Sequence, residues 1–244
     1  MAVNEAFDWR RSDRRLFALI AVLFPLVVLI GFGPTYYLKF AVQSRPVAST
    51  LVHIHGAVMT AWVLLFVAQV WLIRAKQARV HMKMGIAAAL LAAAIIVSGF
   101  FTGVAAAKFG TPSAPPDIPP LAFMIVPLTD IVLFALFFGM ALYYRKQPAT
   151  HKRLMLLTVF NFLPPAMARF PFEWVVAAGP LFFFGVPTLA VLGFLLLDWR
   201  QTGKVNKPYL VGGLILIASY PLRIIISGTD AWLSFAGWLT TWAA

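Results

Sequence analysis

The sequence contains no cysteine, so disulfide bonds, iron–sulfur clusters and thiolate metal sites are excluded. Acidic residues are also scarce, with 8 Asp and Glu against 20 Lys and Arg, and there are only 4 histidines. Any metal or cofactor would therefore have to be bound by histidine, methionine, tyrosine or carboxylate side chains.

Charged residues make up only 11% of the 244 residues, whereas hydrophobic residues make up 61%. This composition is typical of a membrane protein and atypical of a soluble domain. A helix needs about 20 apolar residues to cross a bilayer. The apolar stretches predict seven such helices, over residues 16–38, 51–73, 82–107, 120–144, 154–176, 179–198 and 208–228. We therefore expect an all-α, polytopic membrane helix bundle that forms a single integral membrane domain over residues 1–244.

Most basic residues fall in the turns on one side of the predicted helices. They are Arg10, Arg11, Arg14, Arg15, Arg74, Lys76, Arg79, Lys83, Arg145, Lys146, Lys152, Arg153, Arg200, Lys204 and Lys207. The turns on the other side contain Lys39, Arg45 and Lys108. The positive-inside rule then predicts a cytoplasmic amino terminus and an external carboxyl terminus. Because these residues lie in short loops, we interpret the net charge of +12 as membrane topology and expect no nucleic-acid partner.

Three further patterns predict how the helices pack and end. Gly99 and Gly103 lie on one helical face, where the backbone of another helix can approach closely. The prolines at 164 and 165 are expected to divide the fifth span into two halves. After residue 228, one helical face carries Trp232, Phe235, Leu239 and Trp242. This spacing predicts a short helix in the outer membrane interface.

Two histidines open the second predicted span on its outer side. His53 and His55 are two residues apart, which is about 200° of helical rotation, so at most one of them faces the bundle. His55 is the better candidate because it shares a helical face with Met59. A histidine at a span end can equally be an interfacial residue, so both interpretations stay open at this point.

The other two histidines, His81 and His151, open the third and fifth spans on the cytoplasmic side. Helix N-termini favour negative charge, and Lys83, Lys152 and Arg153 adjoin the two histidines. Two imidazoles on facing helices, surrounded by cations that could bind propionates, fit a bis-histidine haem b. All four histidines are also candidate ligands for a metal ion such as copper or iron.

Charged residues inside the predicted spans form a second candidate site, in the same outer layer as His55. They are Asp130, Arg169, Glu173 and Arg223. An isolated charge in lipid costs several kcal/mol, so these groups should pair or face water. One interpretation is a structural network in which Arg169 pairs with Glu173 and Arg223 with Asp130. The other is an anion site, because two arginines suit a carboxylate, a phosphate or haem propionates.

The chain resembles cytochrome b561-type membrane proteins over about a fifth of its length. The pattern is His55-Gly56-x-x-Met59-x-x-Trp62, basic residues at the end of that span, then His81-x-x-x-Gly85 and a helix of small residues up to Gly99. The resemblance implies transmembrane histidines that ligate haem and carry electrons across the bilayer. The family places its ligands on four consecutive helices, whereas the fourth, sixth and seventh spans here contain no histidine. The chain also looks like uncharacterised multi-pass bacterial inner-membrane proteins.

These observations favour a haem b-binding redox protein of the bacterial inner membrane, quinone-linked or associated with an oxidase. In this hypothesis His81 and His151 are the axial ligands, and Arg169 and Arg223 bind a quinone or another anionic small molecule. The alternative is a metal or small-anion binding protein or transporter that uses the outer His, Arg, Asp and Glu residues. A non-redox membrane enzyme using His55, and a subunit of a homo-oligomer or larger membrane complex without chemistry of its own, also stay open.

Overall fold

The computed structural model describes residues 9–39, 49–110 and 117–242, with residues 9–14 and 202 described by their backbone alone. These ranges contain helices and no β-strand. The longer helices are α1 (Trp9–Phe32), α3 (Thr50–Arg74), α4 (Ala78–Phe109), α6 (Ile125–Tyr143), α7 (Pro148–Asn161), α10 (Pro180–Thr202), α11 (Lys207–Ser227) and α12 (Asp230–Thr240). The shorter ones are η1 (Gly33–Tyr37), α5 (Pro120–Phe123), η2 (Tyr144–Lys146), α8 (Leu163–Met167) and α9 (Glu173–Ala178).

Six segments in the described part of the chain are long and apolar enough to cross a membrane. They are Arg15–Tyr37, Thr50–Arg74, Ala78–Phe109, Pro120–Lys146, Pro180–Gln201 and Lys207–Ser227. They match six of the seven predicted spans, and they support a multi-pass membrane protein. A helix suits this environment because it satisfies its backbone hydrogen bonds internally, where lipid offers no partner.

The predicted fifth span, residues 154–176, is not one helix. The helical segment starts earlier, at Pro148, and is interrupted after Asn161, where α8 takes over until Met167. Pro164 and Pro165 lack the N–H groups that would continue the helical hydrogen bonds, so the interruption falls where the proline pair predicts it. Residues 168–172 are not helical, and α9 follows as a separate short helix.

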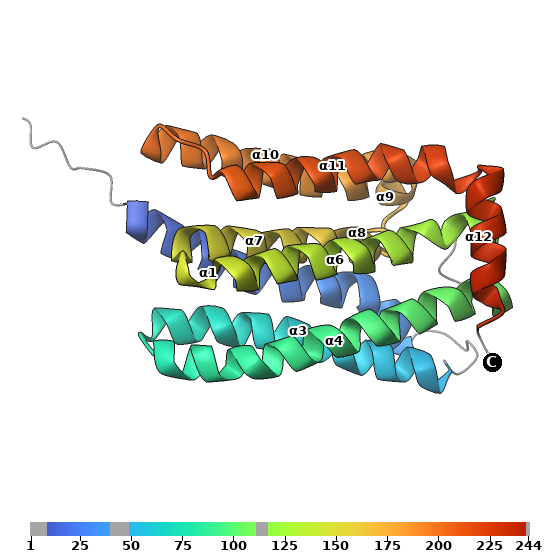
Figure 1. The fold of residues 1–244 in the computed structure, drawn as a ribbon, viewed down its shortest axis with the longest axis horizontal. Coiled ribbons are helices and arrows are strands. Elements are labelled where there is room, and N and C mark those ends of the chain that lie inside the picture. Colours follow the sequence, from blue (N-terminus) through green and yellow to red (C-terminus); the bar gives the residue numbers. More distant parts are fainter. Residues whose placement is uncertain (1–8, 40–48, 111–116, 243–244) are drawn as a thin grey trace, which may run out of the picture.

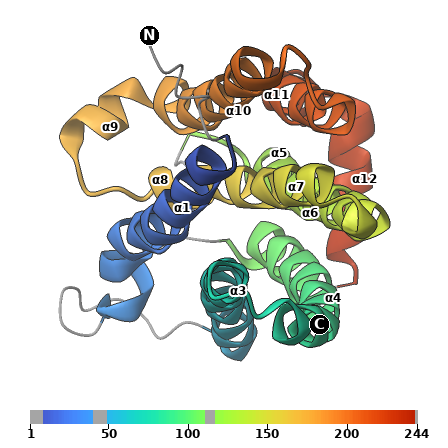
Figure 2. The same ribbon diagram turned by 90° about the vertical axis from the view of Figure 1, so that its left-hand side faces the viewer.

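The long helices form three layers that run along one axis (Figures 1 and 2). The outer layers are α3 with α4 and α10 with α11, and the middle layer contains α1, α6, α7 and α8. The interrupted pair is central, because α7 packs on α6 and α11 while α8 packs on α1 and α10. Several of its side chains are completely buried, including Leu154, Leu156 and Leu157. Its depth in the bundle explains why polar groups on α7 need partners.

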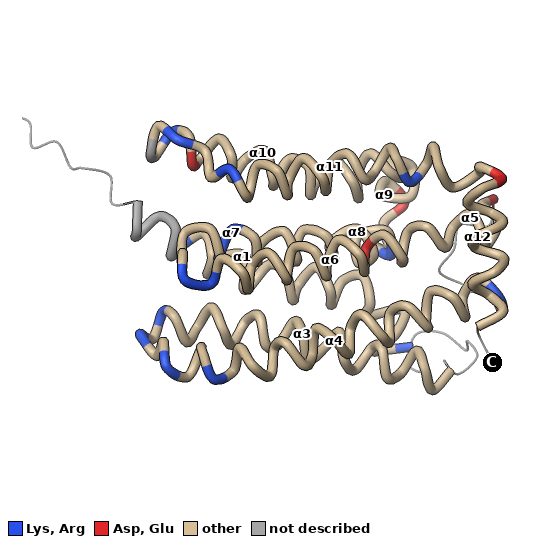
Figure 3. The backbone as a smooth tube through the Cα atoms, viewed as in Figure 1, with Lys and Arg blue, Asp and Glu red and all other residues tan. Residues whose placement is uncertain are grey.

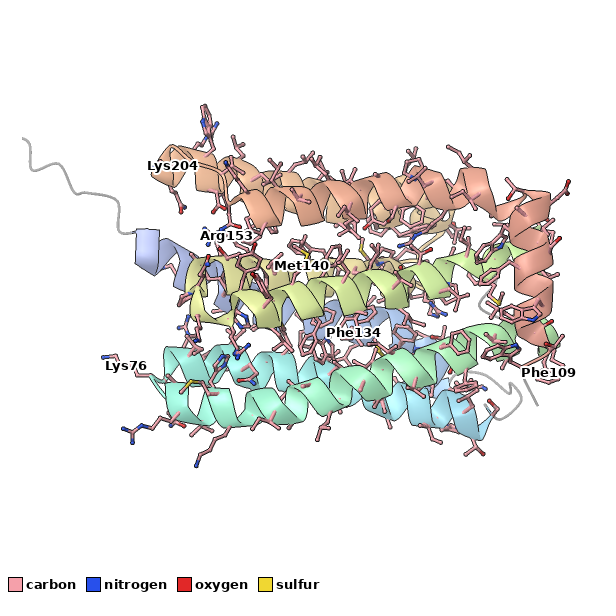
Figure 4. The ribbon with its side chains drawn as sticks, viewed as in Figure 1. Lys76, Phe109, Phe134, Met140, Arg153 and Lys204 are labelled. Carbon is pink, nitrogen blue, oxygen red and sulfur yellow. The ribbon has the colours of Figure 1, made fainter. Side chains whose placement is uncertain are left out.

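An aromatic cluster joins these layers near the middle of the bundle. The fully buried Phe134 of α6 lies 5.0 Å from Trp62 of α3 and 4.9 Å from Phe162, which links α7 to α8, measured between ring centres. Figure 4 shows Phe134 and Arg153 inside the bundle, with Lys76 and Phe109 at opposite ends. Aromatic side chains bury large areas in specific geometries, so this cluster fixes α3 against α6 and α7.

Glycines allow two close helix contacts. A Cβ at Gly99 would lie 3.0 Å from the Ile131 side chain, and one at Gly103 would lie 3.4 Å from Pro127, so α4 meets α6 along the predicted small-residue face. Gly31 of α1 faces the backbone of Ala166 in α8 still more closely, and a Cβ there would overlap the Ala166 carbonyl oxygen.

We predict that Gly31→Ala destabilises the protein by about 1–3 kcal/mol, because α1 and α8 must move apart to relieve the overlap. A Cβ at Gly33, two residues further on, meets no atom within 4 Å, so Gly33→Ala is the matched control. Reversible unfolding in a detergent titration measures both variants. Equal stability of the two variants would contradict the assigned contact between α1 and α8.

The carboxyl-terminal segment forms the predicted short helix, α12, which crosses one end of the bundle (Figure 1). Ala236 and Leu239 are buried, and the Trp232 indole N–H donates to the Leu121 carbonyl at 2.9 Å. Phe235, Trp238 and Trp242 point outward with about half of their surfaces exposed. The four residues of the predicted face therefore divide between two environments: Trp232 and Leu239 contact the bundle, whereas Phe235 and Trp242 are exposed.

Charge is distributed unevenly between the two ends (Figure 3). Lys and Arg gather at the end where α3 meets α4, α6 meets α7 and α10 meets α11, whereas α9 and α12, which lie in the other half, begin with the acidic residues Glu173 and Asp230. The predicted basic Arg45 lies outside the described residues. The asymmetry found in the sequence is therefore also an asymmetry of the folded bundle.

Candidate functional site

The fold brings His81 and His151 together at the basic end. His81 lies in the first turns of α4 and His151 in the first turn of α7, in different layers of the bundle. Their ring centres are 6.4 Å apart and the rings are nearly perpendicular, at 83°. Both side chains are half-buried. Two histidines 70 positions apart in the sequence thus face each other across a helix interface.

Their hydrogen bonds leave nitrogen atoms available. His151 Nδ1 lies 2.8 Å from the Ala141 carbonyl oxygen, and because a carbonyl can only accept, Nδ1 carries the hydrogen. The lone pair of the neutral ring is then on Nε2. His81 Nδ1 is buried without a hydrogen-bond partner among the described residues. Metal-bound histidines commonly donate their second N–H to a backbone carbonyl, as His151 does here.

Gln69 of α3 contacts one member of the histidine pair, His81. Its Nε2 donates to the His81 backbone carbonyl at 3.3 Å, while its Oε1 is buried without a partner in the described part of the chain. Its Oε1 is therefore a hydrogen-bond acceptor without a donor among the described residues, on a residue that contacts the backbone of His81. Gln69 was not identified from the sequence, although a glutamine within an apolar span is the kind of residue that signals a functional or packing role.

The separation of the rings suits two ligands of one metal. Imidazoles bound on opposite sides of a metal ion at about 2 Å have ring centres roughly 6 Å apart. No group of three His, Asp or Glu residues that could bind a metal exists among the residues described. A metal held by this pair would therefore need its remaining ligands from a cofactor or solvent, and a haem provides four.

The predicted cations are arranged differently from the expectation. Arg153 points away from the histidine pair and forms a buried, bidentate ion pair with Asp198 of α10, in which Nε donates to Oδ2 at 2.6 Å. A two-residue offset on a helix places Arg153 on the side of α7 opposite His151. Lys152 lies over the Phe17 ring at 5.5 Å, and Lys83 is exposed. Asp198 was not predicted as the partner of Arg153, because the contact joins two helices through residues 45 positions apart.

The outer histidines do not share a site. His53 is exposed, and its Nδ1 lies 3.4 Å from the Tyr36 hydroxyl. His55 is half-buried, and its Nδ1 lies 3.1 Å from the hydroxyl of the buried Ser98 on α4. Met59 packs against the hydrophobic core one turn further along α3. The structure thus turns His55, and not His53, toward the neighbouring helix.

The predicted pair of Asp130 and Arg223 is present. Arg223 Nη1 donates to Asp130 Oδ1 at 2.6 Å, and both residues are at least 95% buried. Ser219 accepts from Arg223 Nη2 at 3.4 Å, and Asn161 Nδ2 donates to the Asp130 carbonyl at 2.8 Å. The cluster joins α6, α7 and α11 in the half of the bundle near α12.

The predicted pair of Arg169 and Glu173 is absent from the described residues. Glu173 is exposed, while Arg169 donates to the Pro165 carbonyl and lies over the Phe32 ring at 4.7 Å. The prediction assumed helical backbone between residues 169 and 173, which would place the two side chains one turn apart. The helix ends at Met167, so the two side chains diverge. The predicted outer layer therefore separates into Asp130 with Arg223, His55 with Ser98, and Arg169 with Phe32.

No protein-family model matches the chain, and comparison with curated proteins and with solved structures found no match to either. The resemblance to cytochrome b561 therefore stays a prediction from the sequence. Function has to be argued from the geometry of the site.

Proposed function

We propose that the protein is a haem b-binding redox protein of the bacterial inner membrane, with His81 and His151 as the axial ligands. The proposal includes a cytoplasmic amino terminus, with the basic end of the bundle inside. It also includes a seventh span, in which α7 and α8 together cross the bilayer as an interrupted helix. The inner-membrane assignment rests on the sequence resemblance described above and on the multi-pass fold.

The observation that carries the proposal is the juxtaposition of the two imidazoles. Their ring centres are 6.4 Å apart, they come from α4 and α7, and His151 already has its Nδ1 hydrogen bonded to a backbone carbonyl. An interfacial histidine needs only water or a lipid headgroup, and it has no reason to face a second histidine. The Nδ1 of His81 and the Oε1 of Gln69 are also buried without a hydrogen-bond partner among the described residues. Buried polar atoms normally have a partner, and a bound cofactor would account for their position here.

When bound, haem would supply reversible one-electron transfer, with its potential tuned by the axial ligands and by hydrogen bonds to them. The residues of the chain would hold and orient it. The Ala141 carbonyl fixes the His151 ring, the buried Arg153–Asp198 pair ties the first turns of α7 to α10, and Gln69 Nε2 donates a hydrogen bond to the His81 backbone carbonyl.

A quinone or another small anionic molecule is the proposed redox partner. Arg169 is the better candidate to contact it, because its guanidinium has no acidic partner among the described residues and is half-buried. Arg223 is less suited, because Asp130 already compensates its charge. The alternative, an outer metal or anion transport site, is weakened because its proposed ligands lie in three separate places: Asp130 with Arg223, His55 with Ser98, and Arg169 with Phe32.

The visible spectrum of the purified protein tests the proposal. Protein produced in cells supplied with a haem precursor should show a Soret band, with sharp α and β bands after reduction. A pyridine haemochrome assay should give haem b. Protein that stays colourless, and that gains no band when haemin is added, would refute the haem assignment; elemental analysis would then test for a bound metal ion.

A further inference from the structure

The ion pair between Asp130 and Arg223 is surrounded by polar atoms that have no partner. Arg223 Nε, Tyr220 Oη and Asn161 Oδ1 are buried and make no hydrogen bond within the described structure. Arg223, Tyr220 and Asn161 are 3%, 5% and 1% exposed. These values leave no access to bulk solvent, so three polar groups are unsatisfied in one part of the bundle.

All three atoms belong to the same cluster. Asn161 donates to the backbone carbonyl of Asp130, and Arg223 binds the Asp130 carboxylate. The Arg223 guanidinium carbon lies 5.6 Å from the centre of the Tyr220 ring. The unpartnered atoms thus belong to residues of α7 and α11 that contact either the buried Asp130 of α6 or its partner Arg223.

Leaving these atoms unpaired would be costly. A buried donor or acceptor without a partner costs about 1–3 kcal/mol, and the surrounding lipid offers no hydrogen bond in exchange. Buried polar groups in folded proteins are nearly always satisfied by protein or by ordered water. The cluster therefore points to a ligand small enough to enter a packed helix interface.

We propose that Asn161, Tyr220 and Arg223 bind internal water beside the carboxylate of Asp130. The chemistry of the atoms selects this ligand. Arg223 Nε can only donate, Asn161 Oδ1 can only accept, and the Tyr220 hydroxyl can do both, which matches a molecule that donates and accepts. A buried water typically makes about three hydrogen bonds to such groups.

Water fits better than the anion or quinone considered from the sequence. The charge of Arg223 is already balanced by Asp130, so a second anion would bring uncompensated negative charge into the bundle. A quinone ring is much larger than a water molecule, and the three residues that would have to receive it are at most 5% exposed. The proposal concerns the outer half of the bundle and does not depend on haem at His81 and His151.

Radiolytic hydroxyl labelling read by mass spectrometry tests the proposal, because a tyrosine next to bound water is oxidised even when it is buried. Tyr209 is the matched control, since it lies on the same helix, is fully buried, and its hydroxyl already contacts the Val191 carbonyl at 3.4 Å. We expect Tyr220 to be labelled several-fold more than Tyr209, and to incorporate ¹⁸O after equilibration in H₂¹⁸O. Equal, background labelling of the two tyrosines would overturn the proposal.

A variant and two added ligands make the test sharper. Asn161→Leu removes an acceptor and should lower labelling of Tyr220 while leaving that of Tyr209 unchanged. If Asn161→Leu fails to fold, the comparison of Tyr220 with Tyr209 in the unmodified protein still decides. A short-chain ubiquinone analogue and inorganic phosphate should each leave Tyr220 labelling unchanged. Protection by either one would show that the site binds that molecule instead of water. The haem spectrum has no part in any of these outcomes, so the two proposals fail independently.

Discussion

Replacement of His81 or His151 by alanine should abolish haem binding, as loss of the Soret band and of the pyridine haemochrome signal. Under the proposed function, each variant removes one of the two haem ligands, and Gln69, which contacts the His81 backbone, offers only an amide in its place. The imidazoles lie 6.4 Å apart, so the loss of either one leaves the metal bound on a single side. Absorption spectra of equal amounts of purified protein measure the effect.

His53→Ala is the matched control, because its imidazole is exposed and its Nδ1 lies 3.4 Å from the hydroxyl of Tyr36, in a different part of the chain from His81 and His151. It should keep the wild-type spectrum. If His81→Ala and His151→Ala both retain the full band, these residues are not the ligands. Loss of the band in His55→Ala would then move the haem to the outer half of the bundle, near Ser98.

The sequence predicted the architecture well because lipid imposes simple rules. Helices must satisfy their own backbone groups, and apolar length and loop charge determine where they begin and end. Six of the seven predicted spans therefore agree with the helices to within a few residues. The fifth, residues 154–176, is interrupted after Asn161, close to the proline pair that was expected to divide it, so it contains no single helix as long as the other six spans.

Contacts within the candidate sites could be predicted from the sequence only where a charged residue inside an apolar span requires an opposite charge. An arginine and an aspartate inside two apolar spans have to be compensated, and the pairing of Arg223 with Asp130 followed from their depths. The bidentate partner of Arg153 was missed, because Asp198 lies near a span end where a carboxylate can also face solvent. Whether Asp198 faces the bundle or solvent depends on the rotation of α10 about its axis. That rotation is set by helix packing, which a single sequence does not reveal.

The same reasoning explains the unexpected isolation of Arg169 from Glu173. Sequence spacing translates into contact only while the helix continues, and here it stops at Met167. By contrast, the meeting of His81 with His151 depends on α4 and α7 starting at the same end of the bundle. Loop charge predicts this shared end, but not that the two rings turn toward each other.

Asp130→Ala should destabilise the protein by about 3–5 kcal/mol, because it leaves the Arg223 guanidinium buried without a counter-charge. Arginine cannot shed its proton in a protein, so the charge has no way to disappear. Arg223→Ala should cost less, because the remaining Asp130 carboxyl can take up a proton and become neutral. This asymmetry between the two partners distinguishes a buried ion pair from simple loss of packing. Reversible unfolding in a detergent titration measures both variants.

Two further variants separate charge compensation from the volume of the side chains. Glu173→Ala removes an exposed carboxylate from the same half of the bundle and should change the free energy of unfolding by less than about 0.5 kcal/mol. The double variant Asp130→Leu with Arg223→Met removes both charges while keeping apolar volume. It should recover most of the stability lost in Asp130→Ala, since apolar replacement of a buried pair is often neutral. A double variant as unstable as Asp130→Ala would show that the hydrogen bonds of the cluster, and not the balance of charge, hold α6 against α11.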